Sequence, residues 1–131
     1  MTTTLYLVIY MAIVTWLTYL AASLLRAKGW TPAGMQIALG NRDNLPEPTP
    51  LSGRAERTAR NTLENFVLFA AIALVAHISG RAGKRVDEGA EIFFWARIAF
   101  IPVYYAGIVY LRTAVWLVSI IGLAMMIAAI I

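Results

Sequence analysis

The stretch RAERTARNTLENFVLFAAIALVA, residues 54–76, joins a charged segment directly to an apolar one. At 3.6 residues per turn, four of its polar side chains fall on one stripe of a single helix: Arg57, Arg60, Asn61 and Glu64. The apolar run over residues 66–79 has only 14 residues, whereas a helix needs about 20 to cross the hydrocarbon core. This helix therefore crosses a membrane only if it continues back through the polar stripe. Ionisable groups inside a membrane helix are costly, so the stripe predicts a functional site.

Three further segments are long and apolar enough to cross a membrane. Residues 5–25 and 114–131 carry no charge, and residues 92–111 carry only Arg97. We expect an all-α integral membrane protein, a bundle of four transmembrane helices that forms one domain over residues 1–131. The expected helices cover residues 3–27, 52–79, 85–108 and 110–131, with a cytoplasmic loop over residues 28–51.

The loop carries two signals for helix starts. Thr31 followed by Pro32 predicts a short helix at the membrane interface, because proline is favoured in the first turn of a helix. Ser52 stands where an N-cap is needed, so it is expected to cap the second long helix.

Composition excludes an ordinary soluble domain. The chain is 60% hydrophobic and 14% charged, whereas about a quarter of the residues of soluble domains are charged. The net charge of +4 is explained by the excess of Lys and Arg in cytoplasmic loops, so no nucleic-acid partner is expected.

The distribution of basic residues predicts the orientation in the membrane. Seven basic residues lie on the side of the long loop and three on the other side. This bias predicts that both termini lie on the side away from the cytoplasm, which is the periplasm if the membrane is a bacterial inner membrane. The single histidine, His77, does not make a metal site by itself, so no metal is expected.

A charge pair between two helices is also predicted. Glu64 lies 15 residues before Ser79, and Arg97 lies 14 residues after Gly83. In an antiparallel hairpin both would lie about 20 Å from the turn, at a rise of 1.5 Å per residue. Because buried charges need partners, we expect Glu64 to pair with Arg97.

Three motifs together resemble a known family. They are Arg57-x-x-Arg60-Asn61-x-x-Glu64, the pair of Arg97 and Tyr104 seven residues apart, and Arg112 followed by Thr113. This pattern resembles the membrane-associated proteins in eicosanoid and glutathione metabolism (MAPEG), which include microsomal glutathione transferases and prostaglandin E synthase. The resemblance covers nearly the whole chain and is closest to the short bacterial branch, which also shows Gly40-Asn-Arg-Asp43 before a proline-rich loop.

The resemblance implies a homotrimer that binds glutathione, as a cosubstrate, between neighbouring subunits. It implies that Glu64 binds the amino group and the arginines bind the carboxylates, whereas Arg112 and Thr113 lie near the thiol as catalytic residues. The full set of implied glutathione-binding residues is Arg57, Arg60, Asn61, Glu64, Arg97 and Tyr104. Glutathione carries two carboxylates and one ammonium, and a site with several cations and one anion suits it.

Three functions are compatible with these features. The first is a glutathione-dependent transferase or peroxidase that acts on a lipophilic small molecule, an electrophile or a lipid hydroperoxide. The second is a non-catalytic family member that binds membrane lipid, because Phe100 and Trp116 replace a histidine and a tyrosine found in several family enzymes. The third, a small exporter, is disfavoured because such exporters typically carry an acidic residue in the first helix, and residues 5–25 here have no charge.

Overall fold

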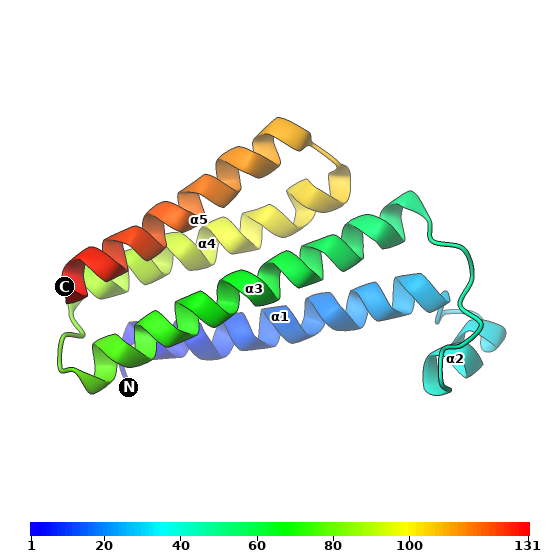
Figure 1. Ribbon diagram of the computed structural model, residues 1–131, viewed down its shortest axis with the longest axis horizontal. Coiled ribbons are helices and arrows are strands. Elements are labelled where there is room, and N and C mark those ends of the chain that lie inside the picture. The colour runs from blue at the N-terminus through cyan, green and yellow to red at the C-terminus, as the bar shows by residue number, and fades with distance from the viewer.

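The fold is built of five α-helices without a β-strand, as a computed structural model of residues 1–131 shows (Figure 1). The helices are α1 (Thr3–Ala27), α2 (Pro32–Leu39), α3 (Pro50–Ile78), α4 (Lys84–Ala106) and α5 (Val109–Ile130). The all-α prediction is confirmed, and the ends of the four long helices lie within two residues of the predicted ends. Of these four, α1, α3 and α5 are long and apolar enough to cross a membrane. α4 is not among them, because its N-terminal half is rich in charged side chains.

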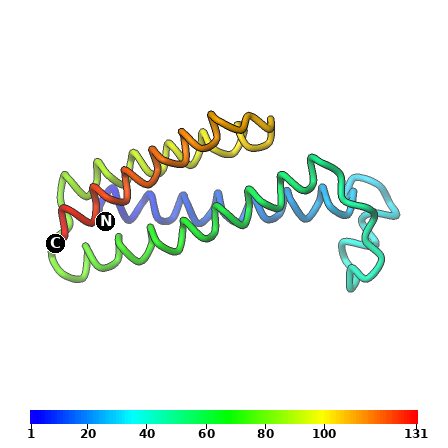
Figure 2. The backbone as a smooth tube through the Cα atoms, turned by 45° about the horizontal axis from the view of Figure 1, so that its top comes forward, coloured from blue at the N-terminus to red at the C-terminus, as the bar shows by residue number.

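The long helices form two antiparallel pairs, α1 with α3 and α4 with α5, and the packing within each pair is more extensive than that between the pairs. Figures 1 and 2 show that the pairs lie close at the end that holds both termini and diverge toward the end that holds α2 and the loop. The main apolar core fills the terminal end. There the rings of Phe69 on α3 and Phe93 on α4 stack at 4.4 Å between centroids. The loop end therefore lacks the packing that closes the terminal end.

A close crossing of backbones fixes the α4–α5 pair. A Cβ atom added to Gly122 would lie 2.6 Å from the carbonyl oxygen of Gly89 and 2.7 Å from the backbone nitrogen of Phe93. Small residues at such a crossing let two membrane helices approach closely. This crossing holds α5 in a defined position against α4.

Asp87 ties the two pairs together at the terminal end. Its Oδ1 accepts a hydrogen bond from the backbone nitrogen of Thr4 at 3.1 Å, and another from the hydroxyl of the same threonine. The first backbone N–H groups of a helix have no partner inside the helix. A carboxylate from α4 therefore satisfies the N-terminus of α1 and complements its dipole.

Two helix starts were predicted near the loop, and the structure confirms one and corrects the other. The short helix α2 is confirmed, and Thr31 caps it by accepting a hydrogen bond from Gly34 N at 2.9 Å. The assignment of Ser52 as a cap is wrong, because α3 begins two residues earlier, at Pro50, and Thr49 is the N-cap. Proline needs no hydrogen-bond partner for its nitrogen and its φ angle suits a first turn, so the helix extends back to it. Ser52 instead completes a capping box with Thr49.

Candidate functional site

A hollow of about 230 Å³ lies between α3, α4 and α5 near the loop end of the molecule, where the two helix pairs diverge. Six residues line it: Asn61, Phe100, Tyr104, Arg112, Thr113 and Trp116. Four of the six belong to the set of site residues predicted from the sequence, and Phe100 and Trp116 are the two positions where the chain departs from family enzymes.

Tyr104 contacts two of the charged side chains near this hollow. Its hydroxyl accepts a hydrogen bond from Arg57 Nε at 3.2 Å. The guanidinium carbon of Arg112 lies 4.6 Å from the centre of its ring, within the range of a cation–π contact. Phe100 meets the same ring edge-on at 5.4 Å between centroids. Two cations from different helices thus converge on one tyrosine, an arrangement that can bind a carboxylate.

The turn between α4 and α5 sets the positions of these groups. Gly107 adopts a left-handed conformation, with φ of 76°, and ends α4. Residues with a side chain adopt this conformation at a cost, so glycine suits the position. Tyr104 lies three residues before Gly107, and Arg112 lies in the first turns of α5. Arg54 on α3 donates from Nε to the carbonyl oxygen of Tyr105 at 2.9 Å, and so ties α3 to this turn.

Arg97 takes a different place from the one predicted. Its side chain is fully buried, and Nη2 donates to the hydroxyl of Thr62 at 3.1 Å. Its guanidinium carbon lies 4.1 Å from the centre of the Phe100 ring. Nε and Nη1 have no hydrogen-bond partner in the chain. Arg97 therefore lies beneath Phe100, behind the wall of the hollow rather than in it.

The predicted pair of Glu64 with Arg97 is wrong for the single chain. The two ion pairs of the structure join Arg26 to Glu56 and Lys84 to Glu88. Arg97 approaches α3 on the side of Thr62, and Glu64 is displaced from Thr62 by about 200° around the helix, at 100° per residue. Glu64 accordingly lies on the outer face of α3 and is exposed.

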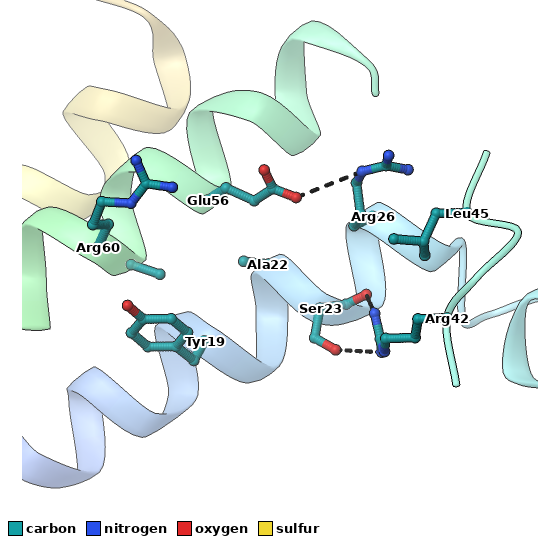
Figure 3. A pocket seen from close by; sticks show the side chains of 9 residues that line it. Tyr19, Ala22, Ser23, Arg26, Arg42, Leu45, Glu56 and Arg60 are labelled. Carbon is teal, nitrogen blue, oxygen red and sulfur yellow. Dashed lines mark hydrogen bonds and ion pairs between the residues drawn. The ribbon is translucent and has the colours of Figure 1, made fainter. Parts of the chain in front are cut away.

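Arg60 is also exposed and lies on the α1 side of α3. There it lines a second hollow, between α1, α3 and the loop (Figure 3). The structure thus brings together Arg57, Asn61, Tyr104, Arg112 and Thr113, and leaves Arg60 and Glu64 on the outer surface.

One residue at the site was missed from the sequence. Arg54 lies one turn before Arg57 on the same helix, so helical spacing could have added it to the stripe. The structure contains no group of three or more His, Cys, Asp or Glu side chains that could hold a metal ion.

Comparison with known proteins gives one match. The model of the MAPEG family matches residues 3–131, which is nearly the whole chain. Neither the curated proteins nor the solved structures contain a match.

Proposed function

The chain belongs to the MAPEG family, and on this premise we propose that it is a glutathione-dependent membrane transferase or peroxidase. The family contains glutathione transferases and peroxidases as well as non-catalytic members. The observation that carries the proposal is the convergence of Arg57 and Arg112 on Tyr104 beside the hollow. Membership in a membrane family and three membrane-length apolar helices identify the chain as an integral membrane protein.

The charges near the hollow suit the chemistry of glutathione. Arg57 and Arg112 supply cations for one carboxylate, and the amide of Asn61 can donate and accept hydrogen bonds. Glu64 lies one turn beyond Asn61 on α3 and is the group we assign to the ammonium of the ligand. Arg60, on the same outer face, is assigned to the second carboxylate. Arg97 acts from behind the wall, where it supports Phe100.

The position of Glu64 supports binding between subunits. It lies 14 residues from either end of α3, at the middle of a helix of membrane length, and its side chain is exposed on the single chain. A charged group that faces lipid at this depth costs about 2.5 to 3.5 kcal/mol. A second copy of the chain that covers this face would remove the cost. We therefore propose a homotrimer in which each neighbour completes the glutathione site.

The orientation follows from the arrangement of the ends. Both termini lie at one end of the molecule and the basic loop lies at the other (Figure 1). With four crossings, including α4, the proposed topology has a cytoplasmic loop and periplasmic termini in a bacterial inner membrane. A reporter enzyme that works only in the periplasm should be active when it is fused after Ile131.

Native mass spectrometry in mild detergent should give a trimer, and a monomer would contradict the proposed assembly.

The proposed reaction uses the positive charge of Arg112, near the N-terminus of α5. Arg112 favours the thiolate form of glutathione over the thiol, because a nearby cation stabilises the anion. The hydroxyl of Thr113 is the second polar group on this side of the hollow. With a lipophilic electrophile from the bilayer, the thiolate would form a C–S bond, either by addition or with departure of a leaving group. With a lipid hydroperoxide it would attack the terminal oxygen and break the O–O bond, so that the lipid alcohol leaves and glutathione sulfenic acid forms; a second glutathione would then convert this acid to the disulfide and water.

A second candidate is a non-catalytic membrane protein of the same family that binds lipid. Phe100 and Trp116 both line the hollow, at positions where several family enzymes have a histidine and a tyrosine. An indole N–H can donate a hydrogen bond but cannot accept one or ionise at neutral pH. In that case the hollow would hold part of a lipid.

The test is a glutathione titration of the detergent-solubilised protein. Arg57→Ala and Glu64→Gln should each weaken binding about tenfold or more, because loss of a charge-assisted contact costs about 1.5 to 3 kcal/mol. Arg112→Ala should lower kcat more than affinity, as expected of a group that acts mainly on the developing thiolate. Arg85→Ala, an exposed arginine at the opposite end of the molecule, is the matched control. Unchanged affinity in both Arg57→Ala and Glu64→Gln would refute the glutathione site and favour the lipid-binding candidate.

A further inference from the structure

The short helix α2 has an apolar face that the rest of the chain leaves exposed. α2 has eight residues, and none of them is charged. Met35 and Leu39 are four residues apart, so they lie about 40° apart around the helix and form one apolar face. Leu39 is 80% exposed and Met35 is 40% exposed. Trp30, two residues before the helix, is 68% exposed. Large apolar side chains are therefore exposed on α2 and directly before it.

α2 is held in a fixed position against the end of α1. Gly34 is buried, and a Cβ atom added to it would overlap the carbonyl oxygen of Lys28, the C-cap of α1. The hydroxyl of Thr31 accepts a hydrogen bond from Gly34 N and donates one to the carbonyl oxygen of Lys28, both at 2.9 Å. Beyond the other end of α2, Arg42 donates to the hydroxyl of Ser23 on α1. Contacts on both sides of α2 thus fix the directions in which its faces point.

The flank of α2 opposite the apolar face is polar. Ala33 and Gln36 line a hollow of about 440 Å³ together with residues 40–44. The side chains of that segment include two asparagines, an arginine and an aspartate. Ala33 and Met35 lie about 160° apart around the helix, at 100° per residue. α2 therefore has one face on α1, one flank beside a polar segment and one apolar face with no covering segment, which is the pattern of a helix that lies at a membrane surface.

The length of α1 places α2 at the surface of the membrane. Residues 5–25 carry no charge and extend over about 31 Å, which matches the hydrocarbon core of about 30 Å. α1 ends at Ala27, about 3 Å beyond this run. Figures 1 and 2 both show α2 beside this end of α1, on the side away from α4 and α5. α2 therefore lies at the level of the lipid headgroups.

We propose that α2 lies in the plane of the membrane surface and inserts its apolar face into the adjacent lipid leaflet. The partner is the lipid surface itself, because Met35 and Leu39 carry no group that would bind a particular headgroup. Trp30 suits this level, since tryptophan is enriched where membrane meets water. The bilayer would then hold the loop from outside, as the contacts with α1 hold it from inside. The proposal goes beyond the proposed function and rests on the crossing of the membrane by α1, not on glutathione binding or on which side the loop faces.

The experiment uses single nitroxide labels, which is direct because the chain has no cysteine. Met35→Cys and Leu39→Cys place the label on the apolar face. Ala33→Cys is the matched control, an exposed position on the polar flank of the same helix. The full chain is placed in liposomes of phosphatidylcholine and phosphatidylglycerol. Power saturation in electron paramagnetic resonance then compares the access of oxygen, which concentrates in lipid, with that of a nickel chelate, which stays in water.

Labels on the apolar face should show a ratio of oxygen access to nickel access several times that of the label at position 33. Their depth should be about 5 to 10 Å below the membrane surface, as for other helices that lie in this layer. If all three labels were equally accessible to nickel, α2 would lie in water and the proposal would be refuted.

A second copy of the chain is the other occupant that the apolar face could have. Labels at positions 35 and 39 would then be shielded from oxygen and from nickel alike, and this result would overturn the assignment to lipid. High oxygen access that stays constant as the ratio of protein to lipid is lowered supports the lipid surface.

A charge placed on either flank tests whether lipid holds the helix. Leu39→Glu puts a carboxylate into the apolar face and should move the label of Met35→Cys toward water, because a charge in lipid is costly. Ala33→Glu adds the same charge on the polar flank and should leave that label at its depth. Both positions lie outside the bundle of long helices, so helix content should equal that of the parent. An unchanged depth in Leu39→Glu, or an equal shift in both variants, would overturn the proposal, because the lipid would then not act on the apolar face.

Discussion

Replacement of Arg97 by methionine tests whether this buried cation has an anionic partner. Methionine is similar in length and in helix propensity, so the change removes mainly the charge and the donors. In the structure the guanidinium makes one hydrogen bond, from Nη2 to the hydroxyl of Thr62, and packs on the ring of Phe100. Nε and Nη1 have no partner in the chain. Arg97→Met therefore changes the free energy of unfolding in two opposite ways. It removes the hydrogen bond and the contact with the ring, which destabilises the protein, and it removes the cost of a buried cation, which stabilises it.

The favourable interactions are the hydrogen bond to Thr62, worth about 1.5 to 3 kcal/mol, and the cation–π contact with Phe100, worth up to about 2 kcal/mol when desolvated. The burial cost is that of a desolvated cation, several kcal/mol, including two unsatisfied donors at about 1 to 3 kcal/mol each. These opposing effects nearly cancel. We expect Arg97→Met to change the free energy of unfolding by between zero and about 2 kcal/mol in the stabilising direction.

The assay is reversible unfolding in mixed micelles, in which the fraction of a denaturing detergent is raised and helix content is followed. Removal of one partner from a buried ion pair destabilises a protein by about 3 to 5 kcal/mol. A loss of that size in Arg97→Met would refute the reasoning, because it would show that Arg97 is paired with an anion. Glu64→Gln is the companion measurement. If Glu64 were the partner, this variant would show a loss of similar size, whereas a Glu64 without a cationic partner predicts no loss.

Two predictions concern the terminal end of the bundle. Gly122→Leu should destabilise the protein by about 1 to 3 kcal/mol in the same assay, because the new side chain would meet backbone atoms of Gly89 and Phe93 that cannot move aside; a neutral effect would show that the two helices separate without cost. Asp87→Ala should cost about 1 to 2 kcal/mol, since both of its hydrogen bonds to Thr4 are removed. Glu88→Ala, which removes a carboxylate from the exposed pair with Lys84, is the control and should have little effect.

The positions of the long helices could be predicted from the sequence, because run length and the location of charges are local properties. The position of each charged residue along its helix could also be estimated. Glu64 lies at the middle of α3, and Arg97 lies two residues past the middle of α4, as a count of residues from the turn implies. The direction in which each side chain points could not be obtained in this way. Helical spacing shows which residues share a face, but the packing of the whole bundle decides which neighbour that face meets.

The contacts that arginines make at the loop end show a second limit of prediction from the sequence. Arg26 with Glu56, Arg42 with Ser23 and Arg54 with the carbonyl of Tyr105 join segments that are far apart in the sequence. An arginine bound to a hydroxyl or a backbone oxygen leaves no periodic pattern, so nothing in the sequence distinguishes it from a solvated arginine. The second hollow, between α1, α3 and the loop, was missed for this reason. The hollow at Tyr104 was anticipated only because several motifs matched one family together.

The two ends of the molecule are stabilised by different interactions, and this explains where the site lies. At the terminal end, aromatic stacking and the glycine crossing bring the helix pairs into apolar contact. Toward the loop end, arginines bridge α3 and α4, through the carbonyl of Tyr105, the hydroxyl of Tyr104 and the hydroxyl of Thr62. Long polar side chains hold helices apart at a fixed distance, whereas apolar packing draws them together. The hollow therefore lies at the loop end because the groups that join the helices there are also the groups that can bind an anion.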